Sequence, residues 1–169
     1  MVSCFIVGRR FYVIVYYSDG KREVTELYDP TKKSWKGLGK DENRLCLDFC
    51  YRKNACVIDG VLYYCGFGGD VRRFDVEIEV DKDLRGIKNK ELIFPGGWVA
   101  NSGGRLVVVW KKGEKKKRKE KEEKDEIWYA EIELMNLGEG DLRGRILFSQ
   151  KVLSASSRSK FVHFDAVSL

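Results

Sequence analysis

Several cysteines and a single histidine are the residues of this chain best suited to metal binding or nucleophilic catalysis. Cys46 and Cys50 lie four positions apart, Cys56 and Cys65 follow, and His163 is the only histidine. A structural zinc site usually takes cysteine pairs separated by two residues, with further cysteine or histidine ligands nearby. This spacing does not match, and the even offset of Cys46 and Cys50 places both side chains on one face of a strand. We therefore expect no metal and no cofactor.

Three other patterns could carry catalysis or bind phosphate, and each has a simpler structural interpretation. A thiol–imidazole pair would need His163 beside a cysteine, but the stretch VHFDA alternates like the face of a strand. GFGGD at residues 66–70 lacks the Gly-Lys-Ser/Thr ending of a phosphate-binding loop, and no helical pattern follows it. Glu77 and Glu79 alternate along a strand as a solvated face. We expect a protein that is not an enzyme.

Half of the formal charge of +6 lies in one low-complexity insert, KKGEKKKRKEKEEKDE, at residues 111–126. Its nine Lys or Arg and six Asp or Glu give it a net charge of +3. Basic clusters such as Lys115 to Lys119 bind nucleic acid or nuclear-import factors in some proteins. The interleaved glutamates and the lack of aromatic residues instead favour a solvated loop between two strands. A basic nucleic-acid-associated protein acting through this insert remains the alternative function.

The rest of the chain alternates apolar and polar residues in short runs, which indicates strands. Aromatic residues make up 12% of the sequence and seventeen glycines punctuate it, as is typical of an all-β protein with many turns. Asp59-Gly60 and Ser102-Gly103-Gly104 separate adjacent runs and predict tight hairpin turns. The predicted strands are Phe11–Tyr17, Val24–Tyr28, Leu45–Tyr51, Ala55–Ile58, Val61–Cys65, Val71–Val80, Leu106–Trp110, Ile127–Leu134, Ile146–Leu153 and Phe161–Leu169.

Three of these runs match one another and mark an internal repeat. RFYVIVYY, VLYYCG and RLVVVW align on Phe11, Leu62 and Leu106, at offsets of 51 and 44 residues. A polar loop and a second matching run follow each of them: VTELYD, VRRFDV and IWYAEI. Such offsets predict one four-stranded unit per repeat, and radially repeated four-stranded sheets are the blades of a β-propeller. We therefore predict an all-β fold, a partial propeller of about three blades.

The boundaries of the repeats follow from this alignment. The repeats are expected at about residues 1–38, 44–84 and 97–153, with the charged insert at 111–126 and a terminal strand at 161–169. In the first repeat VTELYD is the third strand, Asp29 to Lys33 make the corner, and Trp35 stands on the fourth strand. We expect the ring of Trp35 to pack against a neighbouring blade.

The order of these elements resembles the kelch repeat. The best match is ACVIDGVLYYCGFGGDVRRFDV, with Gly68-Gly69 after its second strand, and YDPTKKSW supplies the other half of the motif. DEIWYAEIELMNLGEGDLRGRILFSQKVL is similar to the last blade of plant F-box/kelch-repeat proteins. The resemblance covers most of the chain and implies a partial kelch-type β-propeller that acts as a protein-interaction module.

In that family the kelch region is the substrate receptor that links target proteins to a Skp1–cullin ubiquitin ligase. The printed sequence contains no leucine-rich helical F-box before the repeats. The resemblance therefore implies recognition of an unidentified target protein, and binding of a Skp1-type adaptor only if an F-box is present elsewhere. Membrane partners are not expected, and nucleic acid remains the alternative described above.

Recognition is expected on loops, because loops held by rigid strands commonly carry binding residues. In a propeller the loops between second and third strands, Ser18–Glu23 and Gly66–Asp70, should share one face with the segments between blades, Gly39–Asn43 and Arg85–Gly97. On this face the candidate partner-binding residues are Arg22, Arg52, Lys53, Phe67 and Arg72.

Five cysteines, an odd number, and the lack of an export signal predict free thiols and a cytoplasmic or nuclear location. Three blades are too few to close a ring, so we also expect apolar strand residues at both ends of the stack to meet water. They include Phe5, Ile6 and Val7 at the start and Phe161, Val162 and Phe164 at the end.

Overall fold

The structure is a computed structural model that describes residues 2–7, 10–16, 23–37, 55–66, 68–75, 80–87, 94, 96–113, 124–138, 141–156 and 158–159. Throughout these ranges the chain forms strands and turns, and no helix occurs in them. No described segment is therefore a helix long and apolar enough to cross a membrane.

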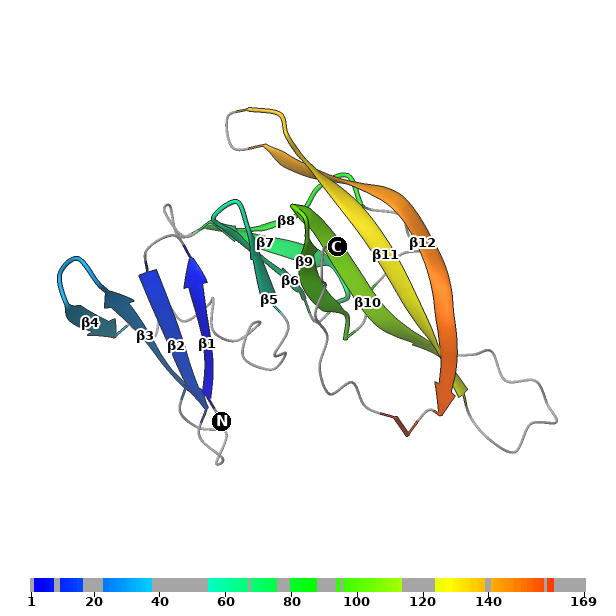
Figure 1. The fold of residues 1–169 in the computed structure, drawn as a ribbon, viewed down its shortest axis with the longest axis horizontal. Coiled ribbons are helices and arrows are strands. Elements are labelled where there is room, and N and C mark those ends of the chain that lie inside the picture. Colours follow the sequence, from blue (N-terminus) through cyan, green and yellow to red (C-terminus); the bar gives the residue numbers. More distant parts are fainter. Residues whose placement is uncertain are drawn as a thin grey trace.

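The described strands form three antiparallel sheets of four strands each, and each sheet is a meander in chain order (Figure 1). This confirms the predicted all-β class and the four-stranded units. The first sheet holds β1 (Val2–Val7), β2 (Arg10–Tyr16), β3 (Glu23–Asp29) and β4 (Ser34–Gly37). The second holds β5 (Ala55–Ile58), β6 (Val61–Cys65), β7 (Val71–Asp75) and β8 (Val80–Asp83). The third holds β9 (Trp98–Ser102), β10 (Arg105–Gly113), β11 (Lys124–Asn136) and β12 (Leu142–Ser156).

Two-residue turns close the inner hairpins of the second and third sheets. Asp59 and Gly60 have φ of 50° and 77°, and Gly103 and Gly104 have φ of 58° and 84°. Positive φ at both central positions defines the hairpin turn whose twist matches the flanking strands, and glycine adopts it without a steric penalty. The predicted turns are therefore confirmed.

The second sheet is buried on both faces. Tyr63 and Cys65 point to one face, and Leu62, Tyr64 and Phe74 point to the other, yet all five are at most 4% exposed. Figure 1 shows the first sheet on one side of the second and the third sheet on the other side. Radial stacking of sheets buries a middle blade in this way.

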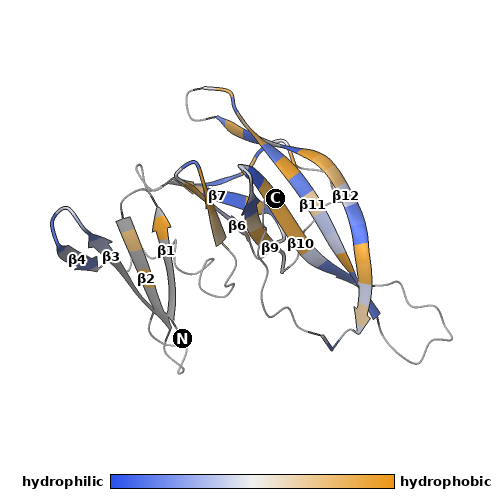
Figure 2. Cartoon of the chain, in the orientation of Figure 1, coloured by the Kyte–Doolittle hydropathy of each residue, from blue (hydrophilic) through white to orange (hydrophobic). Residues whose placement is uncertain are grey.

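The core described by the structure lies between the second and third sheets. β10 is apolar over most of its length, and β11 alternates (Figure 2). Phe94, which precedes β9, meets Trp110 edge to face, with ring centroids 4.8 Å apart. The buried cluster comprises Ile58, Tyr63, Cys65, Val71, Leu84, Ile87, Phe94, Val99, Leu106, Val108, Trp110, Ala130 and Ile132.

The first strands of the second and third sheets are joined by the side chain of Asn101. Its Nδ2 donates a hydrogen bond to the carbonyl oxygen of Val57 on β5, at 3.1 Å. Its Oδ1 accepts one from the amide of Gly104 in the β9–β10 turn, at 2.9 Å. One amide therefore fixes a hairpin turn and ties that hairpin to the neighbouring sheet.

The prediction of a single strand over Val71–Val80 was wrong. This stretch divides into β7 and the start of β8, which pair antiparallel so that Asp75 lies opposite Val80. A run that alternates in this way can pair with itself when the chain reverses, and alternation alone does not show the reversal. The strands predicted at Leu45–Tyr51 and Phe161–Leu169 lie outside the described residues.

Trp35 stands on the fourth strand as predicted, but its predicted packing was wrong. The ring lies against Tyr28 of its own sheet, with centroids 5.0 Å apart, and 53% of Trp35 is exposed. The corner before it is held by Asp29, whose Oδ1 accepts hydrogen bonds from the amides of Thr31 and Lys32 at 2.9 and 3.3 Å. The short β4 thus presents the indole at the surface.

Candidate functional site

Arg72 is the one predicted contact residue that lies within the described part of the chain. It stands on β7, opposite Tyr64 on β6 and Asp83 on β8. Its guanidinium binds Asp81 through two atoms, with Nη2–Oδ2 at 2.6 Å and Nε–Oδ1 at 3.3 Å. Carboxylate oxygens of Asp70 and Asp83 each lie 3.7 Å from Nη1. Arg72 therefore orders a cluster of three aspartates.

The cluster around Arg72 carries more negative than positive charge. Burial by itself lowers the pKa of Arg72, but the hydrogen bond and charge of Asp81 outweigh it, so the pKa is raised above the ordinary arginine value. One fixed cation faces three carboxylates, and Asp70 and Asp83 are more exposed than Arg72. The surface offered to a partner is therefore acidic, and Arg72 holds its carboxylates in place from behind.

The loop that carries Asp70 is docked on the segment that enters the third sheet. Gly66 donates its amide to the carbonyl of Asp70 at 2.8 Å, and Gly69 donates to Gly66 at 3.0 Å. Gly69 in turn accepts a 2.8 Å hydrogen bond from the amide of Phe94. Phe94 belongs to the segment between the second and third sheets. The described part of this segment therefore lies beside the β6–β7 loop, as expected.

The carboxylate of Asp70 closely approaches Gly66. A Cβ atom built on Gly66 would lie 2.7 Å from Oδ1 of Asp70. A side chain there would displace the carboxylate from Arg72. The absence of a side chain at Gly66 therefore leaves room for the carboxylate of Asp70 in the acidic cluster.

The other predicted residues lie outside the described part of the chain. They are the contacts Arg22, Arg52, Lys53 and Phe67, the cysteines Cys46 and Cys50, the carboxylates Glu77 and Glu79, and His163. Among the described residues, no group of three or more His, Cys, Asp or Glu could hold a metal ion. Cys56 is a free thiol, and burial raises its pKa to about 12.

The charged insert lies between the second and third strands of the third sheet, as expected, but its ends are strand rather than loop. Lys111 pairs across the sheet with Ile127, and Gly113 pairs with Asp125. Charged side chains stabilise this stem: Lys111 Nζ lies 3.5 Å from Asp125 Oδ2, and Lys112 Nζ lies 4.9 Å from the centroid of a Trp128 ring. Residues 114–123 lie outside the described part.

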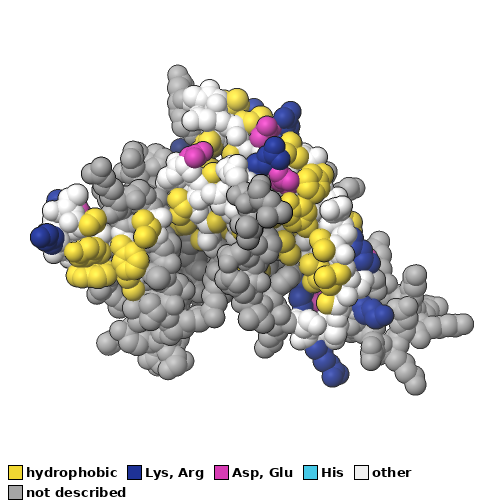
Figure 3. Space-filling view, in the orientation of Figure 1, with side chains coloured by type: hydrophobic (Ala, Val, Ile, Leu, Met, Phe, Trp, Pro, Cys, Tyr) yellow, Lys and Arg dark blue, Asp and Glu magenta, His cyan; other side chains and the backbone are white. Residues whose placement is uncertain are grey.

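Apolar side chains at the surface of β12 were missed by the sequence analysis. β12 is the outer strand of the third sheet, and four of its large hydrophobic residues are exposed: Leu147, Phe148, Val152 and Leu153. Figure 3 shows hydrophobic atoms at the surface along this part of the molecule. The sequence shows one signal of this exposure: the runs ILF (146–148) and VL (152–153) interrupt the alternation of apolar and polar residues. The two interruptions coincide with two register shifts between β11 and β12.

Comparison with known proteins shows that the sequence is similar to plant F-box/kelch-repeat proteins. A putative F-box/kelch-repeat protein of Arabidopsis thaliana is 27% identical over 150 residues, which is 85% of this chain and 36% of the relative. A second F-box/kelch-repeat protein of the same plant is 30% identical over 136 residues, 75% of this chain and 30% of the relative. A third is 25% identical over 175 residues, 97% of this chain and 42% of the relative. No protein-family model matches the chain.

The chain thus spans roughly a third of the length of the curated relatives that it matches. The similarity covers only this third of each relative, so it does not by itself transfer the activities or partners of a whole relative to this chain.

Proposed function

The chain is a homologue of plant F-box/kelch-repeat proteins over most of its length, and on this premise we propose that it is the target-recognition region of a substrate receptor for a Skp1–cullin ubiquitin ligase. Such a region binds a protein and performs no chemistry of its own. Binding of a Skp1-type adaptor then depends on an F-box elsewhere in the polypeptide. The fold alone would not support this function, since propellers host many functions.

The docked β6–β7 loop is the structural observation that best supports target binding. Its backbone is held by hydrogen bonds on both sides, so Asp70 is presented by a rigid loop rather than a loose one. Next to it, Asp83 is partly exposed at the end of β8. A target segment with a lysine or arginine would meet these carboxylates, while Arg72 keeps them in place.

The proposed contact surface comprises the acidic cluster and the predicted contact residues of the same propeller face. The acidic cluster contributes Asp70, Arg72 and Asp83, and the predicted contacts outside the described residues contribute Arg22, Arg52, Lys53 and Phe67. Aromatic residues and arginine are enriched at protein-binding surfaces, and the rims of such surfaces are polar.

We propose a cytoplasmic or nuclear location for the protein. The free thiol of Cys56 supports this, since a reducing compartment keeps cysteines out of disulfides. A fluorescent fusion of the chain, imaged in plant cells, should fill the cytoplasm, the nucleus or both. Fluorescence confined to the secretory pathway would contradict the proposal.

Affinity capture from Arabidopsis extract tests target binding. The unchanged chain should retain a protein that the variant with alanine at Arg22, Arg52, Lys53, Phe67 and Arg72 does not retain. Arg145→Ala is the matched control, because Arg145 also forms an ion pair, with Glu133 at 2.6 Å, but lies on the third sheet. Thermal unfolding of each variant separates lost binding from lost folding.

The assignment of this surface fails if a captured partner binds the five-alanine variant as tightly as the unchanged chain. It also fails if Arg145→Ala weakens binding as much as the five substitutions do.

A further inference from the structure

The middle of the third sheet is buried on both faces. One face carries Leu106, Val108 and Trp110, which belong to the cluster shared with the second sheet. The other, which we call the outer face, carries Val107 and Val109, because side chains alternate along β10. Val107 is 1% exposed and Val109 is 7% exposed, although neither belongs to the shared cluster. A further segment therefore covers the outer face.

The cover on the outer face is narrower than a sheet. It extends to Ala100 on β9, which is 7% exposed, and to Ile127 on β11, which is 8% exposed. On β12, Leu153 pairs with Ile127 and so points to the same face, yet it is 50% exposed. Three neighbouring strands span about 10 Å, which one segment with its side chains can cover. A whole further blade would cover the fourth strand as well.

The course of the chain after β12 indicates which segment this is. Lys111 lies on the outer face, because it follows Val109 at an even offset and pairs with Ile127. Its ammonium group donates a hydrogen bond to the carbonyl oxygen of Ser159 and lies 3.5 Å from the carboxylate of Asp125. Ser159, the last described residue, is therefore held at the margin of the outer face.

The residues that follow have the composition and the length to cover this face. The stretch 160–169 reads KFVHFDAVSL and includes Phe161, Val162 and Phe164. An extended chain advances about 3.3 Å per residue. The five residues after Ser159 therefore reach as far as β10 does from Lys111 to a point beyond Val107.

Other segments outside the described residues fit the outer face less well. Residues 114–123 are all Lys, Arg or Glu and have no apolar side chain to bury. Residues 88–93 lead into Phe94, which packs on Trp110 at the opposite face. Residues 38–54 connect the first and second sheets, which lie on the other side of the third sheet (Figure 1).

We infer that residues 160–169 form a strap across the outer face of the third sheet, anchored by Lys111 and covering Val107 and Val109. Phe161, Val162 and Phe164, which the sequence analysis expected to meet water, are then packed against the sheet. Burial of their apolar surface stabilises the strap. Because Lys111 also lies in the stem of the charged insert, it joins this stem to the strap.

Photo-crosslinking locates the strap directly. Phe164 is replaced by p-benzoylphenylalanine in the 169-residue chain, and the crosslinked peptides are mapped by mass spectrometry after irradiation. The proposal predicts crosslinks within one chain to the outer face of β10 and β11, near Val107 and Val109. Crosslinks to the first or second sheet instead, or none within the chain, would overturn it.

Thiol labelling tests whether the strap is what buries the outer face. Val109→Cys places a thiol on the outer face, and Val108→Cys is the matched control on the shared face. Ending the chain at Ser159 should speed labelling at position 109 by about tenfold or more, because labelling follows the population of the open form. Position 108 should stay protected.

An unchanged labelling rate at position 109 after the truncation would overturn the proposal. If position 108 became equally reactive, the truncation would have unfolded the sheet, and the crosslinks of the full-length chain would then decide.

The anchor is tested by two neighbouring lysines in the full chain carrying Val109→Cys. Lys111→Met removes the hydrogen bond to Ser159 and should speed labelling at position 109 several-fold. Lys112→Met is the control, because Lys112 points to the other face, with Nζ 4.9 Å from the centroid of a Trp128 ring. Equal effects of the two substitutions would show that Lys111 does not anchor the strap.

Discussion

A Cβ atom placed on Gly86 would lie 2.5 Å from the carbonyl oxygen of Gly144. Gly86 follows β8 of the second sheet and Gly144 lies in β12 of the third, so the two sheets meet here backbone to backbone. The amide of Gly144 donates a 2.8 Å hydrogen bond to the carbonyl of Arg85, which completes the junction. Two glycines set the distance between neighbouring sheets.

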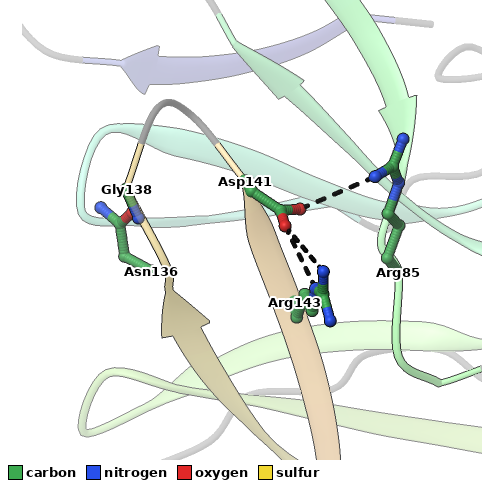
Figure 4. A network of polar contacts seen from close by, with 5 residues as sticks. All are labelled: Arg85, Asn136, Gly138, Asp141 and Arg143. Carbon is green, nitrogen blue, oxygen red and sulfur yellow. Dashed lines mark hydrogen bonds and ion pairs between the residues drawn. The ribbon is translucent and has the colours of Figure 1, made fainter.

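Charged side chains surround this junction, but their ion pairs should contribute little to its stability. Asp141 lies between two arginines, 4.0 Å from Arg85 and 3.0 Å from Arg143 (Figure 4). Both arginines are well exposed to solvent. Ion pairs of this kind typically contribute about 0–1 kcal/mol. The close packing of the glycines should therefore matter more to stability than the ion pairs.

Substituting Gly86 by alanine should destabilise the chain more than a matched substitution at an open position. Gly86 and Gly104 both have positive φ, of 88° and 84°, but a Cβ atom on Gly104 would meet no atom within 4 Å. Gly104→Ala therefore carries backbone strain alone, about 1–2 kcal/mol. Gly86→Ala adds a clash, with a further cost of about 1–3 kcal/mol. Urea unfolding of both variants measures the difference, and equal losses would contradict the proposed junction.

Shortening the charged insert should leave stability nearly unchanged if the strand stem is kept. Replacing residues 114–123 by Asn-Gly keeps every pair from Leu106–Ile132 to Gly113–Asp125. A loop shortened in this way changes the closure entropy by less than about 2 kcal/mol. Removing 111–126 instead deletes the strand pairs and the Lys111–Asp125 ion pair, and should lower the thermal midpoint by several degrees.

The same two variants decide the alternative function. A drop of several degrees for the Asn-Gly variant would show that residues 114–123 pack on the body. Nucleic-acid binding that weakens steeply with salt and disappears in this variant would support the alternative, since neutralised phosphates release counterions.

Ionisation of Cys56 should weaken the fold at high pH. Burial raises the pKa of this thiol from 9.0 to about 12, so above pH 9 the unfolded chain loses a proton that the folded chain keeps. Stability is fully present below pH 9 and falls as the pH rises towards 12, by at most ~1.4 kcal/mol per pH unit for one proton. Cys56→Val removes this dependence. Burial also raises the pKa of Tyr63 to about 12, but Tyr63 is present in both proteins.

The measurement is urea unfolding of the wild type and Cys56→Val at several values between pH 7 and 11. The stability of the wild type relative to the variant should decline above pH 9. A constant difference over this range would show that the thiol is not buried in the folded chain.

The pair Arg72–Asp81 should show stronger coupling than a comparable exposed pair. Arg72→Lys keeps the charge but loses one of the two contacts to Asp81, at a cost of about 1–2 kcal/mol. A double-mutant cycle with Asp81→Asn should give a coupling energy above ~1 kcal/mol. The control cycle on Arg145 and Glu133, which are more exposed, should give less. Equal coupling in both cycles would argue against the supporting role of Arg72.

Local features of the fold could be predicted because their causes are local. The turn at Asp59-Gly60 is fixed by residues that tolerate positive φ, and β5 and β6 around it begin and end at the predicted residues. The repeated run LVVVW lies in β10, and the five residues of this run are buried. Each of these signals lies within a few residues of the structure that it specifies.

The contacts between sheets could not be predicted, because they join residues far apart in the chain. Nothing near Gly86 in the sequence indicates that Gly144 will face it. The acidic character around Arg72 was missed for a related reason: Asp81 and Asp83 approach only because the run after Val71 reverses. The exposed side chains of β12 lie where the register between β11 and β12 shifts, next to Ile127 and Glu131. The alternation of apolar and polar residues does not show where such shifts occur.

Target depletion in cells tests the proposed function most directly. The chain is fused behind an F-box and expressed in Arabidopsis cells, beside the same fusion carrying the five alanine substitutions and one carrying Arg145→Ala. The proposal predicts that a protein captured by the chain falls in abundance with the unchanged and Arg145→Ala fusions, recovers when the proteasome is inhibited, and is unaffected by the five-alanine fusion. A captured protein whose abundance is the same under all three fusions would contradict it.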